Sequence, residues 1–309
     1  MRRTRRRSVS GSDLVARPYR RSNLQIWYHP PYAALMMQPA RDTNLHQSTY
    51  PNLRVWIDGP ALHVQFNRPE KHNALDGGLI AETTAAFRSV RPGAGVRAVV
   101  LSGAGVSFCA GADLDWMRRA ATFTEADNIE DAKLLGRLLA AIADCPVPTV
   151  ARVQGAALGG GAGLVACCDV VVAAATARFG FTEAKLGLLP AVISPYVLQK
   201  IGAGHARALF SVAERFDSQR ALMMGLVHHV APVETLDKTV FSVVEQLRTS
   251  APNASGEARA LIRDVLALPP EAQLEHTART IARLRASDEG REGIAAFLEQ
   301  RSPSWMRGD

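Results

Sequence analysis

A run of very small residues directly after a predicted strand constrains the fold more than any other feature of the sequence. Thr149–Val153 has the length and β-branched content of a buried strand, and residues 155–163 that follow are only Gly, Ala and one Leu. A backbone without bulky side chains approaches its neighbours closely. This segment therefore either packs tightly against another element or holds a ligand through its N–H groups.

A second glycine-containing segment, SFCAGADL at residues 107–114, follows a predicted strand at residues 97–102. If a helix begins at Gly160, the Gly160 N–H has no partner within that helix and lies at its positive end. We predict that the amides of Ala110 and Gly160 hold a carbonyl oxygen as it gains negative charge, each donor contributing about 3–4 kcal/mol. Tight helix–strand packing alone is the competing interpretation, and the two segments by themselves favour neither.

The remaining pattern predicts an α/β core followed by a helical region. Short apolar runs predict strands, and amphipathic segments of helical periodicity lie between them, the first of them capped by Asp76. Beyond Thr182 the pattern is mostly helical, so strand–helix alternation precedes a helical C-terminal part. The predicted strands are 53–58, 61–66, 97–102, 149–153 and 170–174, and the predicted helices run from the Asp76 cap to about residue 90, over 128–143 and over 159–168.

The net positive charge of the chain comes from its first 50 residues. The chain of 309 residues has a net charge of +7, and residues 1–50 contain nine Arg, no Lys and two acids, which leaves 27 charges of each sign in the rest. We expect residues 1–52 to be a disordered, Arg-rich extension. A transit peptide, a twin-arginine signal without its apolar segment, and a translation start near Met37 are alternatives for it. The balanced remainder predicts no binding to nucleic acid, for which only the extension is suited.

Several familiar chemistries have no motif in this sequence. It contains no GxGxxG after a strand, no GxxxxGK[ST] loop, no HExxH and no GxSxG. No apolar stretch is long enough to predict a membrane span, and His228 and His229 are assigned structural roles. The cysteines form no CxxC pair, which predicts reduced, buried thiols in a cytoplasmic protein and no metal site. These cysteines are Cys109, Cys145, Cys167 and Cys168.

Motifs in order along the chain resemble the crotonase (enoyl-CoA hydratase/isomerase) superfamily. They are NRPEKHNAL at 67–75, SFCAGADL at 107–114, VQGAALGGGAGLVACCD at 153–169, ARFGFTEAKLGLLP at 177–190 and EGREGIAAFLEQR at 289–301. The resemblance covers about residues 53–305. It implies a crotonase-like spiral of ββα turns over residues 53–250, a C-terminal helical trimerisation region over 251–309, and a homotrimer or dimer of trimers.

The resemblance also implies how an acyl-CoA substrate binds. The Ala110 and Gly160 amides would form the oxyanion hole for the thioester, and Phe297 would close the CoA site of a neighbouring subunit. Coenzyme A is then part of the substrate, and no further cofactor is expected. The residues implied along the CoA path, or near its phosphates and adenine, are Arg68, Lys71, His72, Ala74, Gly111, Ala112, Asp113 and Leu114.

One of the two glutamates usual in hydratases of this family is missing. The GGGxE position carries Gly163, whereas the FGxPE position carries Glu183 in FGFTE. Adding water to a conjugated double bond needs a base for the water and an acid for the α-carbon, and one carboxyl group serves both tasks only by relaying the proton. We predict Glu183 as the catalytic residue, with a pKa raised by its apolar neighbours.

Three functions follow from these observations. The leading prediction is an enzyme that reversibly hydrates a 2-enoyl-CoA. GGGxGL with FGxxExxLGLLPAVISPYV resembles the single-glutamate branch that includes methylglutaconyl-CoA hydratase-like enzymes of leucine breakdown, whose acyl group is branched and carries a distal carboxylate. Arg118, Arg119 and Lys185 are candidate partners for that carboxylate. A lone glutamate also suffices for enoyl-CoA Δ3–Δ2 isomerisation, and the third alternative is a non-catalytic acyl-CoA-binding protein.

Overall fold

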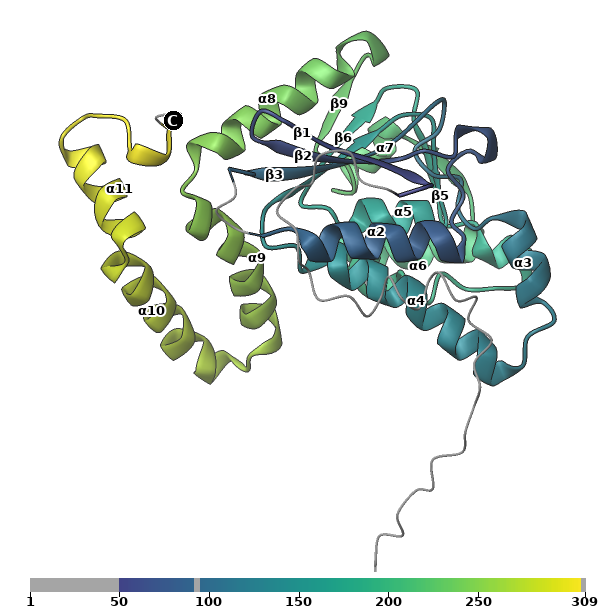
Figure 1. Cartoon of the computed structure of the whole chain (residues 1–309). Helices are drawn as coiled ribbons and strands as arrows, with labels where there is room; N and C mark the ends of the chain where they lie inside the picture. Colours follow the sequence, from purple (N-terminus) through teal and green to yellow (C-terminus); the bar gives the residue numbers. More distant parts are fainter. Residues whose placement is uncertain (1–49, 92–94, 307–309) are drawn as a thin grey trace, which may run out of the picture.

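Two sheets of different size form the centre of the fold. The computed structural model describes residues 50–91 and 95–306 (Figure 1). In the larger sheet β1 pairs antiparallel with β2, and every other neighbouring pair is parallel. Its strand order is β1 (Leu53–Asp58), β2 (Ala61–Phe66), β3 (Ala98–Gly103), β4 (Thr149–Val153), β6 (Val170–Ala174) and β9 (His229–Ala231). The smaller sheet has the order β5 (Ala156–Leu158), β7 (Arg178–Gly180) and β8 (Arg215–Asp217).

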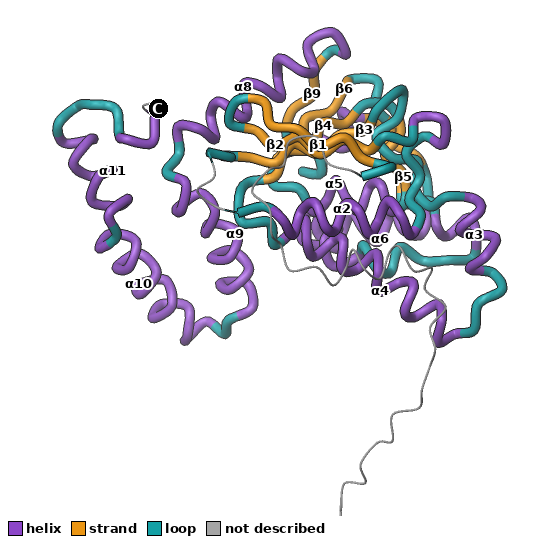
Figure 2. The backbone as a smooth tube through the Cα atoms, in the orientation of Figure 1, coloured by secondary structure: helices purple, strands orange, loops and turns teal. Residues whose placement is uncertain are grey.

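Helices cover both faces of the larger sheet. Most of them form one layer on the side drawn below it, and α8 (Leu236–Thr249) lies on the opposite side against β4, β6 and β9 (Figure 2). Strands β3 and β6, between these layers, are almost completely buried, as parallel strands covered on both faces must be. The lower layer contains α2 (Gly77–Ser89), α4 (Glu125–Ala143), α5 (Gly160–Cys167) and α6 (Ser194–Val212).

The predicted α/β elements agree closely with those observed. Strands β1, β2, β4 and β6 have the predicted bounds, and the Asp76 carboxylate accepts the Leu79 N–H at 2.9 Å to begin α2. Helix α4 starts at Glu125, earlier than predicted, because Thr124 and Asp127 form a capping box. The four strands of three residues, β5, β7, β8 and β9, were not predicted, since three residues are too few to show a period of two.

The N-terminal extension is ordered at its end. Residues 1–49, on which most of the predicted disorder falls, lie outside the described residues. For residues 50–52 the prediction is wrong, because Asn52 donates its backbone N–H and its side-chain amide to the Glu82 carboxylate at 2.8 and 2.7 Å. Tyr50 also packs against the core. The folded part therefore begins at or before Tyr50.

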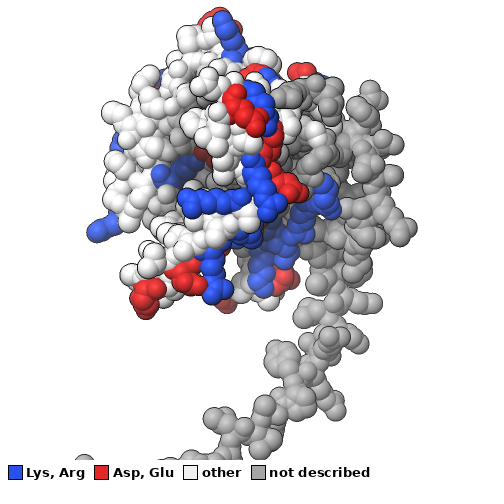
Figure 3. Space-filling model, turned by 90° about the vertical axis from the view of Figure 1, so that its left-hand side faces the viewer, with Lys and Arg blue, Asp and Glu red and all other residues white. Residues whose placement is uncertain are grey.

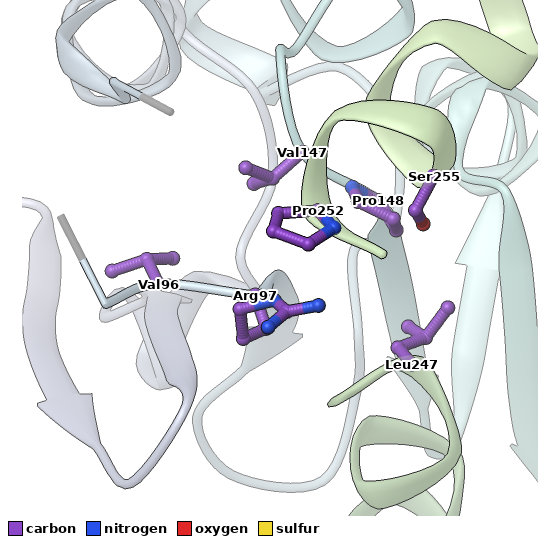
Figure 4. Close-up of a pocket in the computed structure, with 7 residues that line it drawn as sticks. All are labelled: Val96, Arg97, Val147, Pro148, Leu247, Pro252 and Ser255. Atoms are coloured by element: carbon purple, nitrogen blue, oxygen red, sulfur yellow. The ribbon is translucent and has the colours of Figure 1, made fainter. Parts of the chain in front are cut away.

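Three helices project from the core as an arm: α9 (Pro252–Ala267), α10 (Pro270–Ala286) and α11 (Asp288–Leu298) (Figure 1). The predicted boundary at residue 250 falls between α8 and α9. The Arg259 guanidinium fixes α9 to the core by donating to the carbonyls of Cys145 and Val147, and it pairs with Asp169 at 3.3 Å. Figure 4 shows the junction, a small cavity where Arg97 lies beside Pro252 and Leu247.

The arm carries unpaired apolar side chains and paired charges. Viewed from the side of the arm, Lys and Arg side chains cross the middle of the surface with acids beside them (Figure 3). Just after α11, the Arg301 guanidinium pairs with the Glu292 carboxylate at 2.7 Å. A folded monomer rarely leaves so many large apolar side chains on three consecutive helices in water. The exposed apolar residues here are Ile262, Leu266, Leu274, Ile281, Ile294, Phe297 and Leu298.

One histidine at the sheet edge predicts a pH dependence of stability. The Val171 N–H donates to His228 Nδ1 at 2.8 Å, which requires a neutral ring. Burial, Lys200 and His229 lower the pKa of His228 to about 4. Protonation is therefore easier in the unfolded chain, and stability present above the unfolded pKa of about 6.5 is lost as the pH falls toward 4.

We expect the urea concentration at the midpoint of unfolding to decrease when the pH is lowered from 7 to 5. This interval lies above the pKa of ordinary carboxylates. His228→Asn, whose side-chain oxygen accepts the same N–H without titrating, should show a smaller fall over this interval. An equal fall in both proteins would contradict the assignment to His228.

Candidate active site

The amide predicted as the first oxyanion donor is already used within the protein. The Ala110 N–H donates to the His72 carbonyl oxygen at 3.0 Å, so the assignment of Ala110 is wrong. The Ala112 amide, two residues further along the chain, is not used in this way. Gly111 O accepts the Leu75 N–H at 2.7 Å and Asp113 N–H donates to Leu75 O at 2.8 Å, whereas the Ala112 N–H between them has no acceptor within the described residues. Ala112 is also exposed, so its amide is open to a ligand.

The second predicted donor, Gly160, has the expected geometry. Gly160 is the first residue of α5, and the first hydrogen bond of this helix runs from the Gly163 N–H to the Gly159 carbonyl oxygen at 3.0 Å. The Gly160 N–H therefore belongs to the unpaired first turn, at the positive end of the helix. A Cβ on Gly160 would lie 3.0 Å from Leu75 Cδ1. Since Leu75 also pairs with Ala112, both amides lie beside the same residue.

Gly111 explains why the chain turns the Ala112 amide outward. Its φ of +101° belongs to the region that side chains rarely adopt, and a Cβ there would lie 3.1 Å from the Leu158 carbonyl oxygen. Leu158 immediately precedes the turn into α5. Gly111 thus brings the two segments predicted from the sequence against each other.

Glu183 is the acid of the site. It begins the short helix η2 (Glu183–Leu186), and its Oε1 lies 3.2 Å from the point where a Cβ on Gly159 would be. Its Oε2 is buried and has no hydrogen-bond partner in the part of the chain that the structure describes. Burial raises the pKa of the Glu183 carboxyl group, against the effect of its own backbone amide, which confirms the predicted direction. A carboxyl group with one unpaired oxygen, next to the start of α5, is suited to exchanging protons with a bound molecule.

Arg68 and Asp113 form a buried ion pair beside these donors. Arg68 Nη2 lies 3.0 Å from Asp113 Oδ2 and 2.9 Å from Asp76 Oδ2, and Arg68 Nη1 donates to the Ala74 carbonyl oxygen at 2.6 Å. Asp113 also caps α3 (Leu114–Ala120) by accepting two of its backbone N–H groups. Although burial opposes ionisation, Lys71, these amides and Arg68 lower the pKa of Asp113 to about 2. The pair is buried and joins the segment at Ala74 and Asp76 to Asp113, the residue after Ala112.

Three other predicted residues lie at the surface around this pair. The Lys71 side chain is 43% exposed and lies 3.1 Å from Asp113 and 3.3 Å from Asp115. His72 is exposed, with Nδ1 3.0 Å from Ser107 Oγ, and Leu114 is exposed as well. Contact of these residues with CoA remains a prediction. Their exposure on the same side as Ala112 is compatible with it.

Phe297 is not brought to the site within one chain, and the candidate partners of a substrate carboxylate are exposed at the surface. Phe297 lies on α11, on the opposite side of the molecule from α3, and is 82% exposed (Figure 1). Arg118 pairs with Asp115 at 2.6 Å on the surface of α3, and Arg119 and Lys185 are exposed. Only a neighbouring molecule would place Phe297 beside the amides of another chain.

Within the described residues, no group of three His, Cys, Asp or Glu side chains is arranged to bind a metal ion. Across residues 50–91 and 95–306, no helix has the length and apolar character needed to cross a membrane. All four cysteines are buried and unpaired.

This geometry agrees with the relatives of the chain. Residues 59–308 match the family model of enoyl-CoA hydratase/isomerase. The chain belongs to this family. The enoyl-CoA hydratase ACTT6 of Alternaria alternata is 34% identical to it over 76% of this chain and 78% of that protein.

Solved structures show the same fold. An enoyl-CoA hydratase from Shewanella pealeana is 35% identical, with a TM-score of 0.77 over 90% of this chain and all of that one. Pseudomonas aeruginosa AtuE is 38% identical, with a TM-score of 0.80 over 83% of this chain and all of that one. The predicted crotonase-like α/β fold with its helical C-terminal region is confirmed, and the chain is an enzyme of the enoyl-CoA hydratase family.

The buried Arg68–Asp113 pair gives a prediction on stability. Arg68→Ala leaves two carboxylates, those of Asp113 and Asp76, without their shared cation, and removing one partner of a buried pair costs about 3–5 kcal/mol. We expect the free energy of unfolding in urea to fall by about this amount. The control is Arg118→Ala, which removes an exposed arginine paired with one aspartate and should change stability little. Equal effects of the two substitutions would show that the buried pair is not important for the fold.

Proposed function

We propose that the chain catalyses the reversible addition of water to a 2-enoyl-CoA. The observation that carries this proposal is the arrangement of two open amides, on Ala112 and Gly160, beside the unpartnered carboxyl group of Glu183. A thioester oxygen bound by the two N–H groups becomes negatively charged when the β-carbon is attacked, and fixed donors stabilise that charge. Membership of the enoyl-CoA hydratase/isomerase family supports this reading.

In the proposed reaction Glu183 moves one proton from water to carbon. The ionised carboxylate accepts a proton from a water molecule, whose oxygen forms a bond to the β-carbon of the substrate. The electron pair of the double bond moves toward the thioester, whose oxygen is held by Ala112 and Gly160 as an enolate. Glu183 then donates its proton to the α-carbon, which restores the carboxylate and the thioester. A raised pKa suits this role, because the group must both accept and donate a proton near neutral pH.

For the substrate we propose a branched enoyl-CoA with a distal carboxylate, like 3-methylglutaconyl-CoA. The support is the sequence resemblance of residues 159–164 and 179–197 to that branch, together with apolar packing near the site, where Val192 Cγ1 would lie 3.8 Å from a Cβ on Gly136 of α4. Arg118, Arg119 and Lys185 remain the candidate partners of the carboxylate.

Isomerisation is the second candidate, because Glu183 alone suffices to move a proton between two carbons. Turnover in heavy-oxygen water separates the reactions. A hydratase incorporates the label into its product, whereas a Δ3–Δ2 isomerase does not.

We also propose that the active unit is a homotrimer or a dimer of trimers. The support is the arm of α9, α10 and α11, which leaves Leu274, Ile281 and Phe297 exposed in a single chain. Burying such side chains is favourable at about 25 cal/mol per Å² of apolar surface. In this assembly Phe297 covers the CoA site of a neighbour.

Glu183→Gln tests the role of the acid. The amide keeps the size of the side chain but transfers no proton, so we expect turnover of an enoyl-CoA to fall at least about 10²-fold, measured as loss of enoyl absorbance. The matched control is Glu130→Gln on the exposed surface of α4, which should retain full activity. Near-full activity of Glu183→Gln would rule out the proposed mechanism.

Ala112→Pro tests the reassigned donor, because proline has no N–H. In the Glu183→Gln background, a bound enoyl-CoA with a ¹³C-labelled thioester carbonyl should show its C=O stretching band at lower frequency than in water, since two N–H groups polarise the bond. Adding Ala112→Pro should reverse much of this shift and, in the active enzyme, lower turnover about 10²–10³-fold. Circular dichroism checks that the fold is retained. An unchanged carbonyl band would exclude Ala112 as a donor.

A further inference from the structure

Ile193 fills the space in front of Gly163. A Cβ on Gly163 would lie 2.2 Å from Ile193 Cγ2 and 2.7 Å from Ile193 Cβ, so no side chain fits there while Ile193 stays in place. The equivalent point on Gly159 is 3.2 Å from its nearest neighbour, which is Glu183 Oε1. Glu183 thus faces position 159, and Ile193 faces position 163 of the same segment.

These two positions lie at the start of α5. Gly159 is the N-cap of this helix, and the hydrogen bond from the Gly163 N–H to the Gly159 carbonyl oxygen, at 3.0 Å, closes its first turn. The Glu183 carboxyl group and the Ile193 side chain therefore approach the chain one turn apart. The helix η2, which begins at Glu183, also packs against α6.

The position of Ile193 is fixed by the chain that carries it. Ile193 is the N-cap residue of α6, and its carbonyl oxygen accepts the Val197 N–H at 3.1 Å. Its side chain is 2% exposed, and a β-branched side chain has little freedom at its first torsion angle. Glu183 Oε2 is itself buried from solvent and has no hydrogen-bond partner within the described residues.

We propose that Ile193 is a positioning residue that excludes every side chain from position 163, including a second acid, and shields the Glu183 carboxyl group from bulk water. Glu183 thereby remains the single acid of the site. The contact between Ile193 and position 163 is independent of the reaction that the chain catalyses, whereas the effect on Glu183 rests on the proposed function. Each part has its own measurement.

The packing is tested by double substitution and thermal unfolding. Gly163→Ala should lower the melting temperature by several degrees, because one methyl group overlaps Ile193. Ile193→Gly removes both overlapping atoms, so the double variant Gly163→Ala/Ile193→Gly should be more stable than the sum of the single changes predicts. If Ile193→Gly does not fold, Ile193→Ala replaces it, with a smaller but still favourable coupling.

The matched control combines Gly163→Ala with Leu209→Ala, a buried position on α6 well away from α6's N-terminus. That pair should be additive, as distant sites are. Additive effects in the Ile193 pair as well would overturn the proposal.

The effect on Glu183 is tested by the pH profile of kcat/KM. Ile193→Ala lets water reach the carboxyl group, which lowers its pKa, so the loss of activity on the acid side should move to lower pH. Ile193→Val keeps both branches on the β-carbon and should retain the profile of the natural chain. An unmoved profile in Ile193→Ala contradicts the shielding role. If the natural chain turns over no enoyl-CoA, the proposed hydration fails, and the melting temperatures still decide the packing.

Discussion

The close approach of glycine-rich backbone to neighbouring backbone is the interaction on which the site depends. A Cβ on Gly161 would lie 2.4 Å from the Cys109 carbonyl oxygen, and one on Gly155 would lie 1.9 Å from the Val106 carbonyl oxygen. These contacts hold the segment that begins α5 against the segment that ends at Ala112. Side chains at either position would force the segments apart, and the amides of Ala112 and Gly160 would then no longer both lie beside Leu75.

The buried Arg68–Asp113 ion pair also helps to position the Ala112 amide. Arg68 comes from the turn after β2, whereas Asp113 begins α3, and their ion pair joins two distant parts of the chain next to Ala112. Removing both charges from water is costly, so the pair is favourable only because their other hydrogen-bonding groups are also satisfied. The Ala74 carbonyl and the Asp76 carboxylate pair with Arg68, and the first amides of α3 donate to Asp113. Such a network specifies geometry more than it adds stability. Here the network fixes the position of the Ala112 backbone amide.

The sequence predicted the long elements and the raised pKa of Glu183, but it placed the open amide two residues too early. Apolar periodicity and caps such as Asp76 are local signals, which is why β1, β2, α2 and β6 were found with their bounds. The choice between Ala110 and Ala112 depends on which N–H the His72 carbonyl takes, and that partner lies 38 positions earlier in the chain. Only Gly111 gave a local hint, because a glycine with positive φ reverses the direction of the following amide. The short strands and the Ile193–Gly163 contact depend in the same way on distant partners.

The arm and the site place different demands on one chain. Within a single molecule the amides of Ala112 and Gly160 and the carboxyl group of Glu183 are already in place, whereas Phe297 is remote from them and exposed. The proposed catalytic groups are thus preorganised by glycine contacts and buried charges inside the core, and they need no neighbour for their geometry. In the proposed assembly, closing the site against water is the task left to the arm of another chain, and an acid with a raised pKa gains most from that closure, because exclusion of water strengthens every charge interaction around it. This division of tasks would explain why a well-packed core carries an arm with exposed apolar side chains.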